Sequence, residues 1–307
     1  MSIKSTASYE IKEIFRILWL YKYLVLSITS FFAIFSVFYA LSLPNIYTSS
    51  AMLAPSSSNE TLSSKLSSFS SLAGIAGVNF PAAQATKSQE AIQRIRSQEF
   101  FTNFILPNIK LEDLFAVKEW NQKTNLIEYN DDIFDAKNNI WVREVSFPKK
   151  ITPSSQEAYT EWVKLLNVTE NKLTTFVRIT INHQSPHIAK EWLDLIIDKI
   201  NSSTRLEDQR IAKSSIDYLN EYSKSTNVQS LIQAIANLQE IQLQTLMISS
   251  YTEDYVFKTL ESPFVPELKS EPKRSIICIL ITIIGGILSV ITALSIHFYN
   301  EIKQQRK

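Results

Sequence analysis

Few side chains in this sequence have the types and spacing that metal binding requires. His183 and His187 are four residues apart, the spacing at which two imidazoles on one helix can share a metal ion. Pro186 lies between them and favours a helix that begins there, so the two histidines do not share one helix. The glutamate of an HExxH motif is also missing. The adjacent carboxylates at 112–113 and 131–132 are typical of solvated loops. The sequence therefore predicts no metal site.

The sequence also lacks the common motifs of catalysis. No glycine is followed by lysine, so a Walker A motif is absent, and no G-x-S-x-G motif occurs. Hydrolysis of a sugar bond needs two flanking carboxylates, and sequence spacing neither identifies nor excludes such a pair. A net charge of +1 argues against a nucleic-acid partner. We therefore predict a protein that is not an enzyme, with no catalytic residue, no cofactor and no nucleic-acid partner.

Two long uncharged segments predict transmembrane helices. Residues 23–43 and 276–299 contain no charged side chain, and each exceeds the roughly 20 residues that a helix needs to cross a bilayer. No cleavage site of the A-x-A type follows the first segment, so we do not expect a signal peptide. We place the two spans at 23–43 and 275–299.

The charges that flank the spans predict the topology. Tails at 1–22 and 300–307 carry most of the flanking basic residues, so the positive-inside rule places both tails in the cytoplasm. The domain at 44–274 is then on the other side of the membrane. The basic residues of the tails are Lys4, Lys12, Arg16, Lys22, Lys303, Arg306 and Lys307.

Small residues recur along one side of the second span. Gly285, Ser289 and Ala293 are spaced by four residues, and Thr282 and Gly286 lie beside them. Small residues at this spacing let two helices approach closely in lipid. We expect this face to pack on the first span or on a neighbouring chain. Ordinary membrane-helix composition explains the pattern about as well.

The domain between the spans has the pattern of an α+β fold. Elements alternate between strands and helices in an order that suggests a ferredoxin-like base, at 44–184 and 251–262. A serine-rich stretch at 56–80 interrupts it, as a surface loop or as an amphipathic segment facing a partner or an inner cavity. The expected elements are a strand at 46–53, a helix at 88–106, a strand at 140–147, a helix from 154 and a strand at 172–182.

A helical hairpin is expected at about 185–250. Ser185 and Pro186 have the types of an N-cap and a first helical residue, and the helix that follows reaches about residue 224. Its apolar stripe fades in the second half, so this half needs partners outside its own domain. The sequence at 226–229 fits a capping box for a second helix. Four residues there have the a/d spacing of a coiled coil and are our predicted oligomer contacts: Val228, Leu231, Ile235 and Leu238.

A proline-rich strip at 263–274 precedes the second span. Prolines cannot continue a helix or donate to a central β-ladder, so the strip is extended or turned. We expect a short strut between domain and membrane, with its basic pair at the headgroups; docking of a partner is the alternative. The strip contains Pro263, Pro266, Pro272, Lys273 and Arg274.

Three segments resemble one known family. LPNIYTSSAMLAP after the first span, HQSPHIAKEWLDLIIDKIN, and the stretch from LMISSYTEDYVFKTLESPFVPELKSEP into the second span are similar to the Wzz-type O-antigen chain-length determinants, which are polysaccharide co-polymerases. The resemblance covers both ends of the chain and is thin at 107–170. The proline strip matches in position but holds only three prolines, which leaves its extension open.

The resemblance implies a ring-like homo-oligomer in the inner membrane, with its large domain in the periplasm. Such proteins regulate polysaccharide chain length and are not enzymes. The implied partners are further copies of the chain, an O-antigen polymerase, a lipid-linked polysaccharide and the membrane. The alternative is an accessory protein of capsule or exopolysaccharide export that is coupled to a separate cytoplasmic kinase. A sensor is disfavoured because the tails are too short for a signalling domain, and a membrane-anchored glycosidase lacks a recognisable site.

Overall fold

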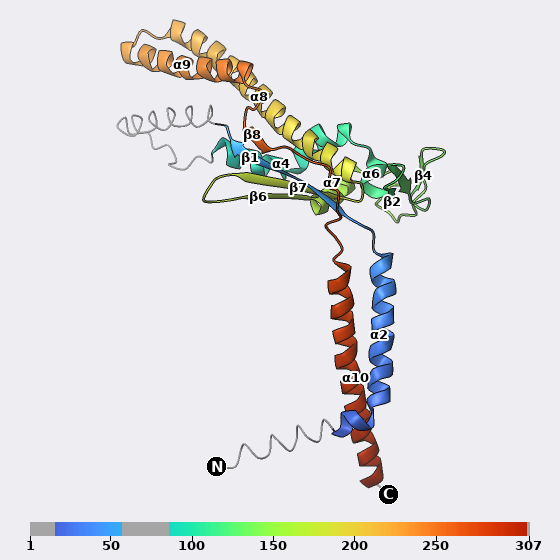
Figure 1. Ribbon diagram of the computed structural model, residues 1–307. Coiled ribbons are helices and arrows are strands. Elements are labelled where there is room, and N and C mark those ends of the chain that lie inside the picture. The colour runs from blue at the N-terminus through green and yellow to red at the C-terminus, as the bar shows by residue number, and fades with distance from the viewer. Residues whose placement is uncertain (1–15, 57–85, 306–307) are drawn as a thin grey trace, which may run out of the picture. The chain divides into compact units, whose positions relative to one another are not determined.

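A computed structural model describes residues 16–56 and 86–305 (Figure 1). The chain divides into two compact units, one formed by Met1–Asn45 with Lys269–Lys307 and the other by Ile46–Leu268. Most of the serine-rich stretch at 56–80, for which two alternatives were open, lies outside the described residues.

The first unit contains the two apolar helices, α2 (Lys22–Ser42) and α10 (Arg274–Gln305). Both are long and apolar enough to cross a membrane, α10 over Arg274–Asn300. They pack against one another along their lengths (Figure 1). Most of their large apolar side chains are exposed. Large apolar residues on the outside and few charges are what lipid favours. The two helices are consistent with a two-pass membrane protein.

The second unit is built on a four-stranded antiparallel sheet. Its strand order is β6-β7-β1-β8, and every neighbouring pair is antiparallel. In chain order this is 2-3-1-4, the order of a ferredoxin-like sheet read from its other edge, which confirms the predicted α+β class. The strands are β1 (Tyr47–Pro55), β6 (Leu166–Glu170), β7 (Val177–His183) and β8 (Phe257–Glu261).

A layer of short helices follows β1. The predicted single helix at 88–106 is wrong, because the chain breaks at Ser97, whose Oγ accepts a hydrogen bond from the Phe100 N–H and begins a new turn. Thr86 and Ser154 cap two helices through full capping boxes. The helices are α4 (Lys87–Ile95), α5 (Gln98–Phe100), the π-helix η1 (Phe101–Ile105), the 3₁₀-helix η2 (Leu106–Asn108), α6 (Leu111–Phe115) and α7 (Ser155–Leu165).

Two small hairpins separate α6 from α7. The strand predicted at 140–147 is present only at β5, and residues 142–148 have no regular structure. Three further strands lie in the region that was expected to be loop. The first hairpin pairs β2 (Val117–Asn121) with β3 (Leu126–Tyr129), and the second pairs β4 (Phe134–Asp135) with β5 (Ile140–Trp141).

The hydrophobic core lies between the sheet and the first half of the long helix α8. Alternate residues of β7 are buried, as the period-2 pattern of a half-buried strand requires. Trp162 of α7 joins the core, with its ring centroid 5.3 Å from that of Trp192 on α8 and 5.2 Å from that of Phe101. Aromatic rings at these distances bury large apolar area, so the three rings connect α7, α8 and η1.

The predicted helical hairpin is present. Helix α8 (Pro186–Ser225) has 40 residues, about 60 Å at 1.5 Å per residue, and α9 (Gln229–Tyr251) returns along it (Figure 1). Ser185 caps α8 as expected, with its Oγ accepting from the Ile188 N–H. The prediction of a capping box at 226–229 is wrong. Val228 is the N-cap residue of α9 and makes no side-chain cap.

Candidate functional site

The face between α2 and α10 contains several small residues. Gly285, Ser289 and Ala293 are buried on α10, and Ser36 and Ala40 are buried on α2. Small side chains leave room for close approach of two backbones, which is the main source of helix association in lipid. The small-residue face of α10 therefore packs on the other span of the same chain.

Gly285 is the point of closest approach. A Cβ atom at this position would lie 2.4 Å from Cβ of Phe32 on α2, which is too close for any real side chain. Phe32 thus occupies the space that the missing side chain of Gly285 leaves free. Pattern reasoning named Gly285 but not Phe32, because nothing in the sequence says which residue of the other helix will meet a small residue.

Gly286 and Thr282 contribute differently. A Cβ atom at Gly286 would meet no atom within 4 Å, so Gly286 does not contact α2, and its predicted packing role stays a prediction for a neighbouring chain only. Thr282 donates from Oγ1 to the Cys278 carbonyl within its own helix. Gly285 and Gly286 are adjacent in sequence, yet only Gly285 is part of the contact with α2.

Polar contacts accompany this packing. The hydroxyl oxygens of Thr29 and Ser289 are 3.3 Å apart across the two helices. The Cys278 thiol lies 3.7 Å from the carbonyl oxygen of Ser36. Interhelical contacts of this kind add on average about 0.6 kcal/mol each in membrane proteins. They align the helices but do not hold them together alone.

The ends of the two helices are joined by a polar clamp at Asn45. Arg274 Nη2 donates to the Leu43 carbonyl at 3.2 Å and to Asn45 Oδ1 at 3.1 Å. Lys269 Nζ donates to the same Asn45 oxygen at 3.1 Å. Arg274 was expected at the lipid headgroups, but its guanidinium is bound to the other end of the chain, whereas Lys273 is exposed. Asn45 had no sequence signal, because its partners lie more than 200 residues away.

The proline-rich strip is bound to the sheet over its first part. Pro263 and Pro266 are buried, and the carbonyl of Phe264 between them accepts a 2.8 Å hydrogen bond from Ser49 Oγ on β1. The prediction of a free strut that begins at residue 263 is therefore wrong. Only residues 267–273 can act as a linker. Pro272 is half-buried just before α10.

The four predicted oligomer contacts do not share one environment. Ile235 is buried inside the hairpin, at 5% exposure, while Val228, Leu231 and Leu238 are 53%, 41% and 43% exposed. The a/d spacing therefore does not form a single seam within this chain. Leu238 lines a shallow groove on the hairpin together with Ser214, Ser215, Tyr218, Leu219 and Gln242.

His183 is engaged by the backbone on both ring nitrogens. Its Nδ1 accepts from the Ser185 N–H at 2.9 Å, so Nε2 carries the proton and donates to the Asp113 carbonyl at 2.8 Å. Burial lowers the pKa of this imidazole below its ordinary value, although its backbone hydrogen bonds and the Asp113 charge act in the opposite direction. The His183 ring thus has no nitrogen left for a metal, and it fixes the start of α8 in its neutral form.

Two polar side chains that position β8, those of Asn201 and Asp208, were not predicted from the sequence. Buried Asn201 on α8 accepts from the N–H groups of Val256 and Phe257 and donates to the Phe257 carbonyl, all within 2.9–3.0 Å. Asp208 accepts from Tyr255 at 2.6 Å and from Lys87 Nζ at 2.6 Å. The hydrogen bonds connect α8 to both α4 and β8. None of these residues forms a recognisable local motif.

Comparison with known proteins finds one family that is similar to the first third of the chain. Residues 8–106 match the family model described as Wzz, chain length determinant protein. This segment contains α2, β1 and α4, and it includes LPNIYTSSAMLAP, one of the stretches that carried the resemblance. Over this part, about a third of its length, the chain is similar to the Wzz chain length determinant family. No curated protein matches the sequence at a significant level.

Two solved structures are similar over most of the chain. A full-length bacterial polysaccharide co-polymerase is 13% identical, with 94% of this chain and 97% of that chain covered and a TM-score of 0.40. A fragment of WzzB, polysaccharide co-polymerase from Salmonella Typhimurium, is 14% identical, with 74% and 100% covered and a TM-score of 0.33. The strand order and the helix pairs described above carry the fold assignment, and these scores add no argument to it.

Proposed function

We propose that this protein is a non-enzymatic regulator of polysaccharide chain length, acting on an O-antigen or a similar lipid-linked glycan. The observation that carries the proposal is the match of residues 8–106 to the chain length determinant family, in a chain whose α+β domain lies between two apolar helices. His183 is buried and both of its ring nitrogens are hydrogen-bonded to the backbone, which supports a structural role for this residue. Regulation then acts through assembly and positioning rather than through a bond-breaking site.

The proposed arrangement is an inner-membrane scaffold with both tails in the cytoplasm and the domain in the periplasm. The basic residues of the tails support this orientation. Copies of the chain form a ring-like homo-oligomer in which the hairpins lie side by side. The exposed apolar residues Val228, Leu231 and Leu238 support the hairpin as a contact between copies, because an exposed apolar surface of sufficient size marks a protein interaction site.

A separate polymerase and its lipid-linked glycan are the proposed partners of this scaffold. Pro263 and Pro266 are buried on the sheet, so they are not available to a partner in the folded domain. Phe264, at 55% exposure, and Leu268, at 84%, are the large apolar side chains of the strip that a polymerase can reach. Replacing both by serine tests docking at the strip without disturbing the buried prolines.

The test is the glycan length distribution of a strain that lacks the gene. Deletion is expected to replace a narrow range of chain lengths by a broad one, and complementation with the intact gene is expected to restore the range. Separation of the glycan on a gel measures both. A strain that makes less surface glycan with an unchanged length distribution would favour the export accessory instead and contradict length regulation.

A further inference from the structure

One loop of the domain presents an unusual exposed aromatic residue. Phe147 is 97% exposed, the largest exposed fraction of any apolar side chain among the described residues. Lys149 and Lys150 follow it and are exposed, and Ile151 is 57% exposed. An aromatic ring and an aliphatic side chain beside two lysines combine burial in acyl chains with attraction to phosphates.

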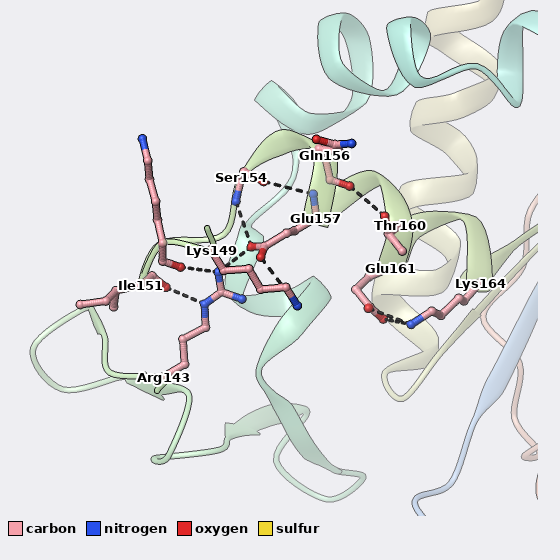
Figure 2. Close-up of polar contacts among 10 residues, drawn as sticks. Arg143, Lys149, Ile151, Ser154, Gln156, Glu157, Thr160, Glu161 and Lys164 are labelled. Atoms are coloured by element: carbon pink, nitrogen blue, oxygen red, sulfur yellow. Dashed lines mark hydrogen bonds and ion pairs between the residues drawn. The ribbon is translucent and has the colours of Figure 1, made fainter. Parts of the chain in front are cut away.

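The loop is held in shape by one arginine (Figure 2). Arg143 donates to the backbone carbonyls of Lys150 and Ile151, both at 2.6 Å, and pairs with Glu157 Oε2 at 2.6 Å. These contacts close the chain at the base of residues 144–150. Arg143 is partnered by Glu157, so the charges of the loop itself are those of exposed Glu144, Lys149 and Lys150, which sum to +1. Lys149 Nζ lies 4.0 Å from Glu157 Oε1 and is mostly exposed. The hydrogen bond from Arg143 also holds the pKa of the Glu157 carboxyl below its usual range.

The loop lies at one identifiable end of the sheet. The Arg143 guanidinium is 5.8 Å from the ring centroid of Phe115 on α6, and the Asp113 carbonyl on α6 binds His183. His183 pairs with Tyr47, the first residue of β1. The loop therefore belongs to the Tyr47 end of the sheet, on the side where α6, β2 and β4 are drawn in Figure 1.

The length of the connecting chain limits how far the Tyr47 end of β1 can lie from the end of α2. Helix α2 ends at Ser42 and β1 begins at Tyr47, so the intervening chain spans at most about 18 Å. The opposite end of the sheet is the β6–β7 turn at 171–176, next to Val177, which pairs with Leu53. Leu53 lies six residues after Tyr47 on β1, so this turn is about 20 Å from the Tyr47 end of the sheet.

We propose that loop 144–151 is a membrane-docking loop, which inserts Phe147 at the headgroup level of an anionic phospholipid surface while Lys149 and Lys150 contact phosphates. The anionic surface fits the charge of the loop tip, and the two spans of the same chain supply the bilayer. The loop adds a third membrane contact besides α2 and α10. The proposal concerns lipid contact and does not depend on the glycan function.

Lipid quenching of a fluorophore in the full-length protein tests the proposal. The single cysteine, Cys278, is replaced by alanine, and a bimane probe is attached to Ser146→Cys, next to Phe147. The matched control is Thr174→Cys, next to Leu173, which is 95% exposed but lies in the turn at the other end of the sheet. Both proteins are placed in nanodiscs that contain phosphatidylglycerol and lipids brominated near the headgroup.

We expect at least about threefold stronger quenching at position 146 than at position 174. Phe147→Ser and the pair Lys149→Gln with Lys150→Gln are each expected to reduce quenching at 146 by about half or more, and so is removal of the anionic lipid. Equal quenching at 146 and 174 would overturn the proposal. Protection of the 146 probe from both the lipid quencher and aqueous iodide would also overturn it, because a protein surface would then cover the loop.

Discussion

The chain contains two long antiparallel helix pairs that are packed in opposite ways. In the α2–α10 pair the small residues are inside and the large apolar residues are outside. In the α8–α9 pair Ile235 and Ile241 are buried between the helices, but Tyr218, Leu238 and Met247 remain outside. Lipid removes any penalty for outward apolar side chains, whereas water does not. Outward apolar residues are therefore ordinary in the first pair, whereas a group of them on the second pair indicates an interaction surface.

The strongest test of this contrast is truncation of a buried and an exposed residue of the hairpin. Ile235→Ala is expected to lower the free energy of unfolding of the hairpin by about 2–4 kcal/mol, because it leaves a cavity between α8 and α9. Leu231→Ala, at a 41% exposed position, is expected to cost less than about 1 kcal/mol in the isolated chain. Hydrogen exchange of α9 amides measures both.

The same two variants separate folding from assembly. Leu231→Ala is expected to weaken the oligomer more than it weakens the hairpin, as measured by native mass spectrometry of detergent-solubilised protein. An oligomer that is unaffected by Leu231→Ala and by Leu238→Ala would mean that the outward leucines do not lie between copies. The contrast between the helix pairs would then need another explanation.

The second test exploits the two adjacent glycines of α10. Gly285→Leu is expected to separate α2 from α10, because its side chain would occupy the space of Phe32, and overpacking typically costs about 1–3 kcal/mol. Disulfide crosslinking between cysteines placed on the two helices is expected to fall several-fold. Gly286→Leu is the matched control and is expected to crosslink like the unaltered chain, since nothing lies within 4 Å of its Cβ position. Equal loss in both variants would contradict the observed helix faces.

The third and smallest effect is a pH dependence of the domain's stability, which arises from His183 at the base of the hairpin. Burial lowers the pKa of His183 from its ordinary 6.5, so below that pH the unfolded chain binds a proton that the folded chain resists. The stability of the domain is therefore expected to fall as the pH drops below about 6.5. Chemical denaturation at several pH values measures it. His183→Gln is expected to flatten the dependence of stability on pH. The control, His187→Gln at an exposed position, is expected to preserve it. If stability depends on pH equally steeply in His183→Gln, the effect belongs to other groups.

Sequence patterns predicted the parts of the structure that depend on local periodicity. Both spans, the hairpin, the Ser185 cap and the α+β class follow from hydrophobic spacing and helix-breaking residues. The break at Ser97 was missed because the apolar pattern at 88–106 continues through it, while the side chain of Ser97 accepts a backbone hydrogen bond and starts a new turn. The hairpins at 117–141 have short strands that carry little alternating pattern.

The contacts between distant residues could not be predicted for a different reason. The pairing of Gly285 with Phe32 depends on how two helices are rotated about their axes, and spacing within one helix does not fix that rotation. The burial of Pro263 and Pro266 depends on the position of β8 at the edge of the sheet. Asn201 binds β8 through its side-chain amide, and nothing in the sequence distinguishes it from a solvent-exposed asparagine.

The clamp at Asn45 has a mechanical consequence. Arg274 at the start of α10 is bonded to Leu43 and Asn45, just after α2, so the two helices cannot slide along one another without breaking these bonds. The small-residue face further along the helices resists the same sliding through close contact at Gly285. A force applied along one helix is therefore transmitted to the other helix through these contacts, which are loaded in shear. Under tension we expect the two spans to act as one anchor and to leave the bilayer together in a single rupture event.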